Sequence, residues 1–334
     1  MIEDAKADEQ SLSGMPNLLH VFSEDPLILI GVSPHIHIYL EALGEISKKK
    51  RIHFICVISW TLYEMGDLVL AEYQRMKNEF PNILITYMCN SPEEFSLGRE
   101  KGIPSFYCSQ NAFLNENSYE ILPNERRVFS AIYLAAFADY KRHYLAKEVK
   151  SLALVGYPQK ASYRSIFNTL PHAQFINFDA EQRYRWIEHS ELVTSLNRSR
   201  VGLCLSRVEG AMFASAEYLL CGLPIVSTTS LGGREVLFDE RYSMVVEDNP
   251  TQIAKAVQTL IDKKISPYEV RERTLELMAW HRRQFDEFIK KIFISEGVPL
   301  EKRKDSYRAL PNKVFTNYSK EELLNFLDVL KDRL

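Results

Sequence analysis

Two glutamates, Glu209 and Glu217, stand eight residues apart in an otherwise mostly apolar segment. Eight residues of helix span about two turns, so the two carboxylates lie at different depths along one element. Carboxylate oxygens accept charge-assisted hydrogen bonds and therefore suit vicinal diols. With this spacing, one carboxylate can meet sugar hydroxyls at the mouth of a site while the other reaches a ribose deeper inside. The alternative is that both glutamates only flank a solvated helix face.

The residues between the two glutamates are suited to binding an anion. A strand ends near Ser206, a loop follows at Arg207 and Val208, and the next helix is expected over 210–221. Gly210 permits the backbone to approach a ligand closely. Free N–H groups at a helix start point outwards and form a natural diphosphate site. Here these groups belong to Ala211, Met212 and Phe213.

Short apolar runs alternate with helical periods along most of the chain. The apolar runs predict strands at 27–32, 52–59, 83–88, 104–109, 128–135, 152–157, 173–178, 201–206, 223–227 and 243–247. The helical periods predict helices at 35–46, 62–79, 92 onwards, 139–149, 161–169, 188–199, 210–221, 250–263 and 267–293. Ser91 and Asn249, each followed by a proline, are predicted helix N-caps, and Glu94 completes a capping box. Fully apolar strands that alternate with helices indicate parallel sheets covered on both faces.

This alternation occurs twice, which predicts an α/β protein with two doubly wound parallel-sheet (Rossmann-like) domains that face each other across a cleft. Such sheets bind ligands at the carboxyl ends of their strands. The chain of 334 residues is long enough for two domains. We expect a disordered N-terminus over 1–14, an N-terminal domain over 15–125, a C-terminal domain over 126–292 and a helical tail over 293–334.

The region around the two glutamates resembles a known family. Ser206-Arg207-Val208-Glu209-Gly210, followed by Glu217-Tyr-Leu-Leu-Cys-Gly-Leu-Pro-Ile-Val, looks like the E-x7-E block of the retaining GT-B glycosyltransferases of family four, also called group one. Gly232 and Gly233 match the family's "GG-x-x-E" loop, whose last position is Glu235. The resemblance is strong from about 190 to 265 and extends back to about 128.

The resemblance implies roles for individual residues. Glu209 would contact the transferred sugar, Glu217 the ribose, and backbone groups over 210–213 the diphosphate or sugar hydroxyls. The family's "G-R-x(4)-K" segment, which neutralises the diphosphate, aligns its Lys with Lys141. Its Arg falls on Ala136, so this chain departs from the pattern there.

Without a metal, a cation must stabilise the departing diphosphate. Lys141 fits this role, and Arg142 is the candidate for the second charge. The alternative is that Lys141-Arg142-His143 is only the solvated start of a helix.

Four further positions are weaker candidates for the site. Gly31, Ser33 and His35 follow the first strand, where GT-B proteins often place a glycine-rich loop, and could lie on the acceptor side. The alternative for Ser33 is a structural role at the start of the next helix. Phe178, at a strand end, could line the pocket for the base, or it is simply a buried core residue.

Composition restricts the remaining possibilities. A formal net charge of -3 gives no general attraction to nucleic acid. Five cysteines without a CxxC pair indicate reduced thiols, and no Cys/His constellation predicts a metal site. The sequence shows no signal peptide and no apolar run of membrane-spanning length, so we expect a cytoplasmic protein. Lys48, Lys49, Lys50 and Arg51 could make a weak peripheral contact with the inner face of the membrane, or they form a solvated turn.

The resemblance therefore implies a retaining glycosyltransferase that needs neither metal nor cofactor. It would move a hexose-type sugar from a nucleotide-sugar donor, by default a UDP-sugar, to a glycan, lipid-linked or other hydroxyl acceptor. One rival is a catalytically degenerate nucleotide-sugar-binding or partner protein, which Ala136 favours. Another is a GT-B nucleotide-sugar epimerase, which needs additional acid/base carboxylates and histidines that the sequence does not reveal.

Overall fold

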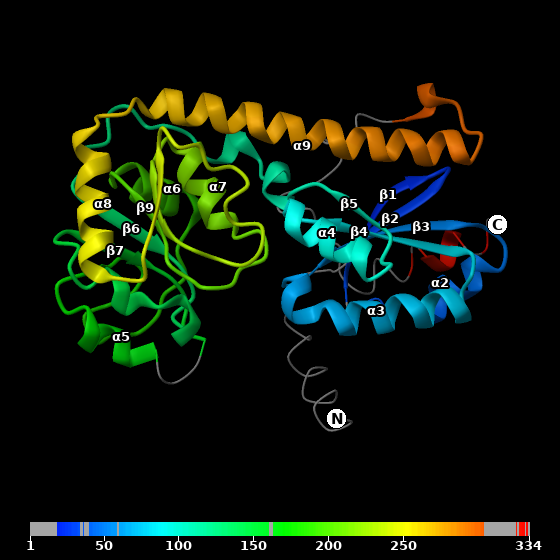
Figure 1. The fold of residues 1–334 in the computed structure, drawn as a ribbon, viewed down its shortest axis with the longest axis horizontal. Coiled ribbons are helices and arrows are strands. Elements are labelled where there is room, and N and C mark those ends of the chain that lie inside the picture. Colours follow the sequence, from blue (N-terminus) through cyan, green and yellow to red (C-terminus); the bar gives the residue numbers. More distant parts are fainter. Residues whose placement is uncertain are drawn as a thin grey trace. The chain divides into compact units, whose positions relative to one another are not determined.

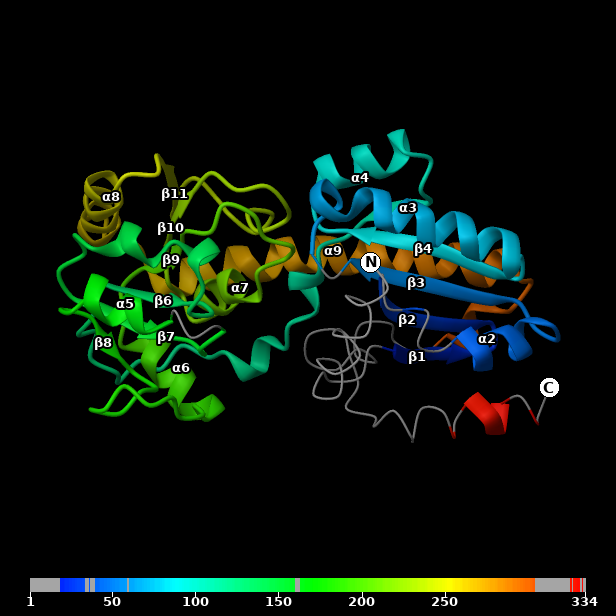
Figure 2. The ribbon, with the colours of Figure 1, turned by 90° about the horizontal axis from the view of Figure 1, so that it is seen from below.

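The computed structural model describes residues 19–33, 36, 40–58, 60–159, 163–303, 325, 327–330 and 332. The chain divides into two compact units (Figures 1 and 2). Unit 1 is drawn from Met1–Phe113 and Arg282–Leu334, and unit 2 is Leu114–His281. In this division the segment 114–125 groups with unit 2 and the segment 282–292 with unit 1, whereas the sequence analysis assigned each to the other domain.

Unit 1 contains a five-stranded sheet in the order β1-β2-β3-β4-β5. Its strands are β1 (Leu19–Glu24), β2 (Leu27–Ser33), β3 (Ile52–Ile58), β4 (Ile83–Cys89) and β5 (Ser105–Tyr107). Strands β2 to β5 pair in parallel, as expected, with registers such as Gly31↔Cys56 and Cys56↔Tyr87. The edge strand β1, which was not predicted, pairs antiparallel with β2. The antiparallel direction of β1 results from the short connection at residues 25 and 26, because only antiparallel strands can be joined so tightly.

Helices and the end of the chain cover both faces of this sheet. Its helices are α2 (Leu40–Ser47), α3 (Leu62–Glu79), α4 (Pro92–Glu100), the 3-10 turns η3 (Gln110–Phe113) and η8 (Leu300–Lys302), and the second half of α9 (Pro267–Ser295). Alternate residues of β2 and β3 pack on α2 and α3, together with Leu327 and Leu330. The intervening residues pack on Phe285, Ile289 and Phe293 of α9. Helix α9 lies on the face of the sheet opposite α2 and α3 (Figure 1). Burial on both faces explains why β2 and β3 are mostly apolar, with Ser33 and His53 as the polar exceptions.

Unit 2 contains a six-stranded parallel sheet in the order β11-β10-β9-β6-β7-β8. Its strands are β6 (Ala131–Leu134), β7 (Leu152–Val155), β8 (Gln174–Phe175), β9 (Gly202–Cys204), β10 (Ile225–Thr228) and β11 (Ser243–Val246). The strand order reverses between β6 and β9, since the chain proceeds outwards from β6 on one side and from β9 on the other. In open α/β sheets this reversal is the switch point at which ligands bind, outside the carboxyl ends of the strands.

The helices of unit 2 confirm most of the predicted elements but not all. They are α5 (Arg164–Thr169), α6 (His189–Asn197), α7 (Phe213–Leu220), α8 (Pro250–Asp262) and the first half of α9, with 3-10 turns η4 (Glu116–Ser118), η5 (Asp139–Lys141) and η6 (His143–Ala146). Asn249 caps α8 as predicted, because its side chain accepts hydrogen bonds from the N–H groups of Thr251 and Gln252.

Two predicted helices need correction. The helix expected over 139–149 is instead two 3-10 turns, because Arg142 between them adopts a left-handed conformation with φ 52° that a helix cannot contain. The helix expected over 210–221 begins only at Phe213, since Met212 is also left-handed, with φ 49°. Both departures lie at the carboxyl edge of the sheet. A left-handed non-glycine residue costs roughly 1 kcal/mol or more, and such strain is commonly found at functional sites.

Candidate functional site

The switch point of unit 2 brings together the two charges that the sequence analysis singled out. Lys141 lies in the segment that follows β6, and Glu209 lies in the loop that follows β9. The ammonium of Lys141 donates to Oε1 of Glu209. Both residues are buried, Lys141 with 9% and Glu209 with 4% of its surface exposed. The hydroxyl of Ser206 donates to the same carboxylate oxygen. Three of the predicted site residues therefore meet at one atom.

Backbone contacts hold both partners in place. The hydroxyl of Tyr133 donates to the carbonyl of Lys141 at 2.6 Å. On the other side, the N–H of Glu209 donates to the carbonyl of Leu231 at 3.0 Å. Because these contacts come from β6 and from the loop after β10, the position of the pair depends on three neighbouring parts of the sheet edge.

Arg142 lies at the same edge but points into the protein. Its Nε donates to the carbonyl of Leu205 at 2.6 Å, its Nη2 to Oγ1 of Thr228 at 2.7 Å, and its Nη1 to Oδ2 of Asp248 at 2.5 Å. These partners follow or end β9, β10 and β11, so the guanidinium ties the carboxyl ends of three strands together. All three nitrogens of the side chain thus have protein partners. The guanidinium is turned away from a diphosphate, as expected if the chain is the catalytically degenerate binding protein of the alternative hypothesis.

Arg234 is a residue of this site that the sequence analysis missed. Its side chain is fully buried, and Nη1 donates to the carbonyl of Ser206 at 2.6 Å. Nη2 donates to Oγ of Ser227 at 2.9 Å and to the carbonyl of Thr228. The only signal for it in the sequence was its place directly after Gly232 and Gly233. A sequence pattern alone does not distinguish such a buried arginine from a solvated one.

The loop before α7 and the double-glycine loop lie against each other. The N–H of Gly233 donates to the carbonyl of Gly210 at 2.8 Å, and Gly232 has φ 110°, a conformation that side chains rarely adopt. Ala211 and Met212 are buried, with 6% and 8% exposed surface, while Phe213 is half-buried at the helix start. The two loops that carry Gly210, Ala211, Met212, Phe213, Gly232 and Gly233 thus lie beside Glu209.

Glu217 is buried, with 2% of its surface exposed. The hydroxyl of Tyr119 donates to its Oε1 at 2.9 Å. Arg271 on α9 donates to the carbonyl of Tyr119 and to that of Glu116, the latter at 2.9 Å, and so holds the segment that carries the tyrosine. One carboxylate oxygen of Glu217, the residue predicted to bind the ribose, is therefore already hydrogen-bonded to Tyr119.

Phe178 belongs to an aromatic cluster on the other half of the sheet. Its ring stacks on Phe137 with centroids 5.0 Å apart and meets Phe167 and Tyr184 edge-on. With 8% of its surface exposed, it contributes mainly to the core.

The acceptor-side candidates lie in and after β2. Gly31 is inside the strand and not in a loop, because β2 continues to Ser33. Ser33 has no exposed surface and donates to the carboxylate of Glu72. His35 lies outside the described residues.

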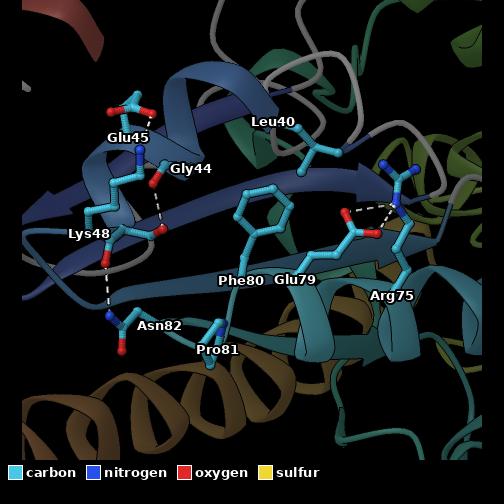
Figure 3. Close-up of a pocket in the computed structure, with 10 residues that line it drawn as sticks. Leu40, Gly44, Glu45, Lys48, Arg75, Glu79, Phe80, Pro81 and Asn82 are labelled. Carbon is cyan, nitrogen blue, oxygen red and sulfur yellow. Dashed lines mark hydrogen bonds and ion pairs between the residues drawn. The ribbon is translucent and has the colours of Figure 1, made fainter.

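The cationic cluster Lys48 to Arg51 makes contacts within unit 1. Lys48 pairs with Glu45 at 2.5 Å, Lys50 donates to the carbonyl of Glu24 at 2.8 Å, and Arg51 pairs with Glu296 at 3.0 Å. Lys48 also lines a surface groove of about 490 Å³ between α2 and the turn before β4, with Phe80 on its wall (Figure 3). Surface ion pairs of this kind are weak, so the contacts neither require nor prevent a membrane contact.

Two features of the described residues bear on metal and membrane. No three His, Cys, Asp or Glu side chains of the described part of the chain are grouped as metal ligands. None of the helices that the structure describes is both long and apolar enough to cross a bilayer.

His143, next to the site, provides a pH-dependent test of the fold. It packs on Tyr133 and Phe137, and burial together with the charge of Lys141 lowers the pKa of His143 to about 3. Between pH 6.5 and pH 4 the unfolded chain binds a proton here that the folded chain does not. The free energy of unfolding therefore decreases as the pH is lowered through this range, by about 1.36 kcal/mol per pH unit for this group.

We expect His143→Phe to remove about 3 kcal/mol from the loss of unfolding free energy between pH 7 and pH 4. Urea denaturation of both proteins at the two pH values measures this difference. Equal losses in the two proteins would show that His143 is not neutral and buried in the folded state.

Comparison with known proteins identifies the fold. Residues 131–263 match the family described as glycosyl transferases group 1. A search of curated protein sequences found no match. Among solved structures, the chain is similar to HepE of Anabaena in complex with UDP, with a TM-score of 0.59, 12% sequence identity and 78% of each chain covered.

Two further structures are similar. One is sucrose-phosphate synthase from Thermosynechococcus elongatus (TM-score 0.57, 16% identity, 77% of this chain and 72% of that chain covered). The other is α,α-trehalose-phosphate synthase from Burkholderia vietnamiensis (TM-score 0.50, 14% identity, 81% and 73% covered). These likenesses confirm the predicted fold class: the two parallel-sheet α/β units are those of the GT-B glycosyltransferase fold. The matched family segment contains Lys141, Glu209 and Glu217.

Proposed function

We propose that this chain is a retaining, metal-independent glycosyltransferase that moves a hexose-type sugar from a UDP-sugar to a hydroxyl acceptor. The observation that carries the proposal is the buried ion pair of Lys141 with Glu209 at the switch point of unit 2. The pair lies within the segment that matches glycosyl transferases group 1. The choice of UDP is supported by the similar HepE, whose structures contain UDP or UDP-glucose.

In the proposed reaction, the bond between the sugar and the nucleoside diphosphate breaks first. The ammonium of Lys141 and the N–H groups at the start of α7 stabilise the negative charge of the departing diphosphate. Glu209 accepts hydrogen bonds from hydroxyls of the sugar and fixes its orientation. The acceptor oxygen then bonds to the anomeric carbon on the face that the diphosphate leaves, so the anomeric configuration is retained. The leaving phosphate takes the proton of the acceptor hydroxyl, and no general base from the protein is needed.

The proposal makes demands on two other residues. Glu217 would bind the ribose through the carboxylate that also accepts the hydrogen bond of Tyr119, so the two interactions must share it or exchange. For the acceptor we keep the sequence-based assignment to the end of β2 and the residues that follow it in unit 1, where His35 remains a candidate, whereas Ser33 is buried in β2 and bonded to Glu72. A glycan, a lipid-linked sugar and another hydroxyl compound are all compatible with this assignment.

A second candidate is a protein that binds a nucleotide-sugar without transferring it. The observation in its favour is Arg142, whose guanidinium is bonded to Leu205, Thr228 and Asp248 and not directed outwards. Ala136 at the family's arginine position agrees with this candidate.

Calorimetric titration of the metal-free protein with UDP, GDP, ADP and their common sugars tests the donor site. We expect micromolar binding that is selective for UDP and its sugars and is weakened at least tenfold in Glu217→Ala. Release of UDP from UDP-glucose in the presence of candidate acceptors, with the anomeric configuration of the product determined by NMR, separates transfer from binding alone. Absence of binding to every nucleotide would overturn both candidates, whereas selective binding without release would leave the second.

A further inference from the structure

The cations Lys141, Arg142 and Arg207 each lie beside a carboxylate at the switch point of unit 2. The charge of Lys141 is balanced by Glu209, to which it is bonded. The guanidinium of Arg142 is bonded to Asp248 and two other oxygens. The exposed Arg207 lies towards β11, with Nη2 3.7 Å from Oδ2 of Asp248. Besides Lys141 itself, the described residues on the β6 and β7 side can therefore offer neutral hydrogen-bond donors to a bound diphosphate.

Two tyrosines lie on that side. Tyr140 directly precedes Lys141 in η5, and its ring centroid lies 5.0 Å from Nζ of Lys141. Tyr157 follows β7, the strand that pairs with β6. The N–H of Phe137 donates to the carbonyl of Tyr157 at 2.8 Å and so joins the two loops. The fold thus places both tyrosines beside the ion pair.

Both side chains reach solvent and keep their protons. Tyr140 is 40% and Tyr157 55% exposed, although large apolar rings are usually covered. Partial burial and the negative charge of Glu209 raise the pKa of Tyr140 to about 12 and also raise the pKa of Tyr157. A phenol that stays protonated at neutral pH is a hydrogen-bond donor to an anion.

We propose that the hydroxyls of Tyr140 and Tyr157 donate hydrogen bonds to the second, sugar-linked phosphate of the nucleotide-sugar beside Lys141. This inference rests on the proposed function and adds two donor-binding residues to it. The charges of Lys141 and Glu209 largely cancel in the adjacent ion pair. The two neutral hydroxyls supply further hydrogen bonds to the phosphate oxygens. The same hydrogen bonds strengthen as the diphosphate departs and its negative charge grows.

Tyr140→Phe, Tyr157→Phe and the double variant test the proposal, because each keeps the ring and its packing and removes one hydroxyl. Calorimetry would measure the affinities of each protein for UDP and for UMP. We expect the ratio of UDP to UMP affinity to fall about tenfold for each hydroxyl removed, the usual range for a hydrogen bond to a charged group. Thermal unfolding of each variant shows whether the fold is intact.

Tyr63→Phe in unit 1 is the matched control, since Tyr63 is also 40% exposed, and it should leave the ratio unchanged. An unchanged ratio in the double variant would overturn the proposal, and so would an equal loss for UDP and UMP, which would place the hydroxyls on the nucleoside or its first phosphate. Failure of the proposed function is distinguishable, because the unmodified protein would then bind neither nucleotide.

Discussion

Replacing Lys141 by methionine should reduce turnover of the donor by about 10²–10³-fold, the usual loss when one group that stabilises a developing anion is removed. The ammonium is the cation bonded to Glu209 at the switch point, and it is the charge closest to the departing diphosphate in the proposed reaction. The measurement is the rate of UDP release under saturating donor.

The same variant should also lose stability, and this effect can be separated from the loss of catalysis. Methionine leaves Glu209 as a buried charge without its cation, which costs about 3–5 kcal/mol when a buried pair is broken on one side. The double variant Lys141→Met/Glu209→Gln removes both charges and should recover most of that stability without recovering turnover. The exposed Lys147 of the same segment gives the control, and Lys147→Met should behave as the unmodified protein. Wild-type turnover in Lys141→Met would contradict the assigned role.

Replacing Arg234 by methionine should lower the free energy of unfolding by about 3 kcal/mol and abolish nucleotide binding. The fully buried guanidinium donates to Ser206, Ser227 and Thr228, and methionine leaves these oxygens without their partner. Ser206 in turn donates to Glu209, so the loss passes to the ion pair. Urea denaturation gives the first effect and calorimetry with UDP the second.

A surface arginine of the same unit provides the comparison for Arg234. Arg126 is exposed, and Arg126→Met should shift neither the denaturation midpoint nor the affinity for UDP. If Arg234→Met unfolds at the same urea concentration as Arg126→Met, the buried hydrogen bonds contribute little. Arg234→Lys tests the geometry, because a lysine keeps the charge but cannot reach Ser206 and Thr228 through two separate nitrogens.

The order of strands and helices was largely readable from the sequence, because burial on both faces makes the parallel strands continuously apolar. Helix α3 was predicted with both ends correct, and α9 to within two residues at its C-terminal end. The cap at Asn249 was also predicted, since it depends on two adjacent residues only. The strand β1 was missed because its short run gains stability only from pairing along the edge of β2.

The carboxyl edge of unit 2 is where local patterns failed. The segment 139–149 has a helical pattern, yet Arg142 is left-handed there because its side chain bonds to Leu205, Thr228 and Asp248, three residues distant in sequence. Met212 likewise delays the start of α7. At Arg142 these tertiary contacts outweigh a local preference of order 1 kcal/mol.

By itself the sequence determined the two-fold α/β alternation, the glutamates at 209 and 217 and the family resemblance around them, because these depend on residue type and spacing along the chain. Only the tertiary structure decided that Lys141 pairs with Glu209 and that Tyr119 donates a hydrogen bond to Glu217. The same holds for Arg142 and Arg234, whose guanidinium groups donate to carbonyl oxygens that follow β9. The physical reason is that such pairings join residues far apart in the sequence, and which segments become neighbours is set largely by the order of strands in the sheet. That order results from the packing of the whole unit and not from any segment of it.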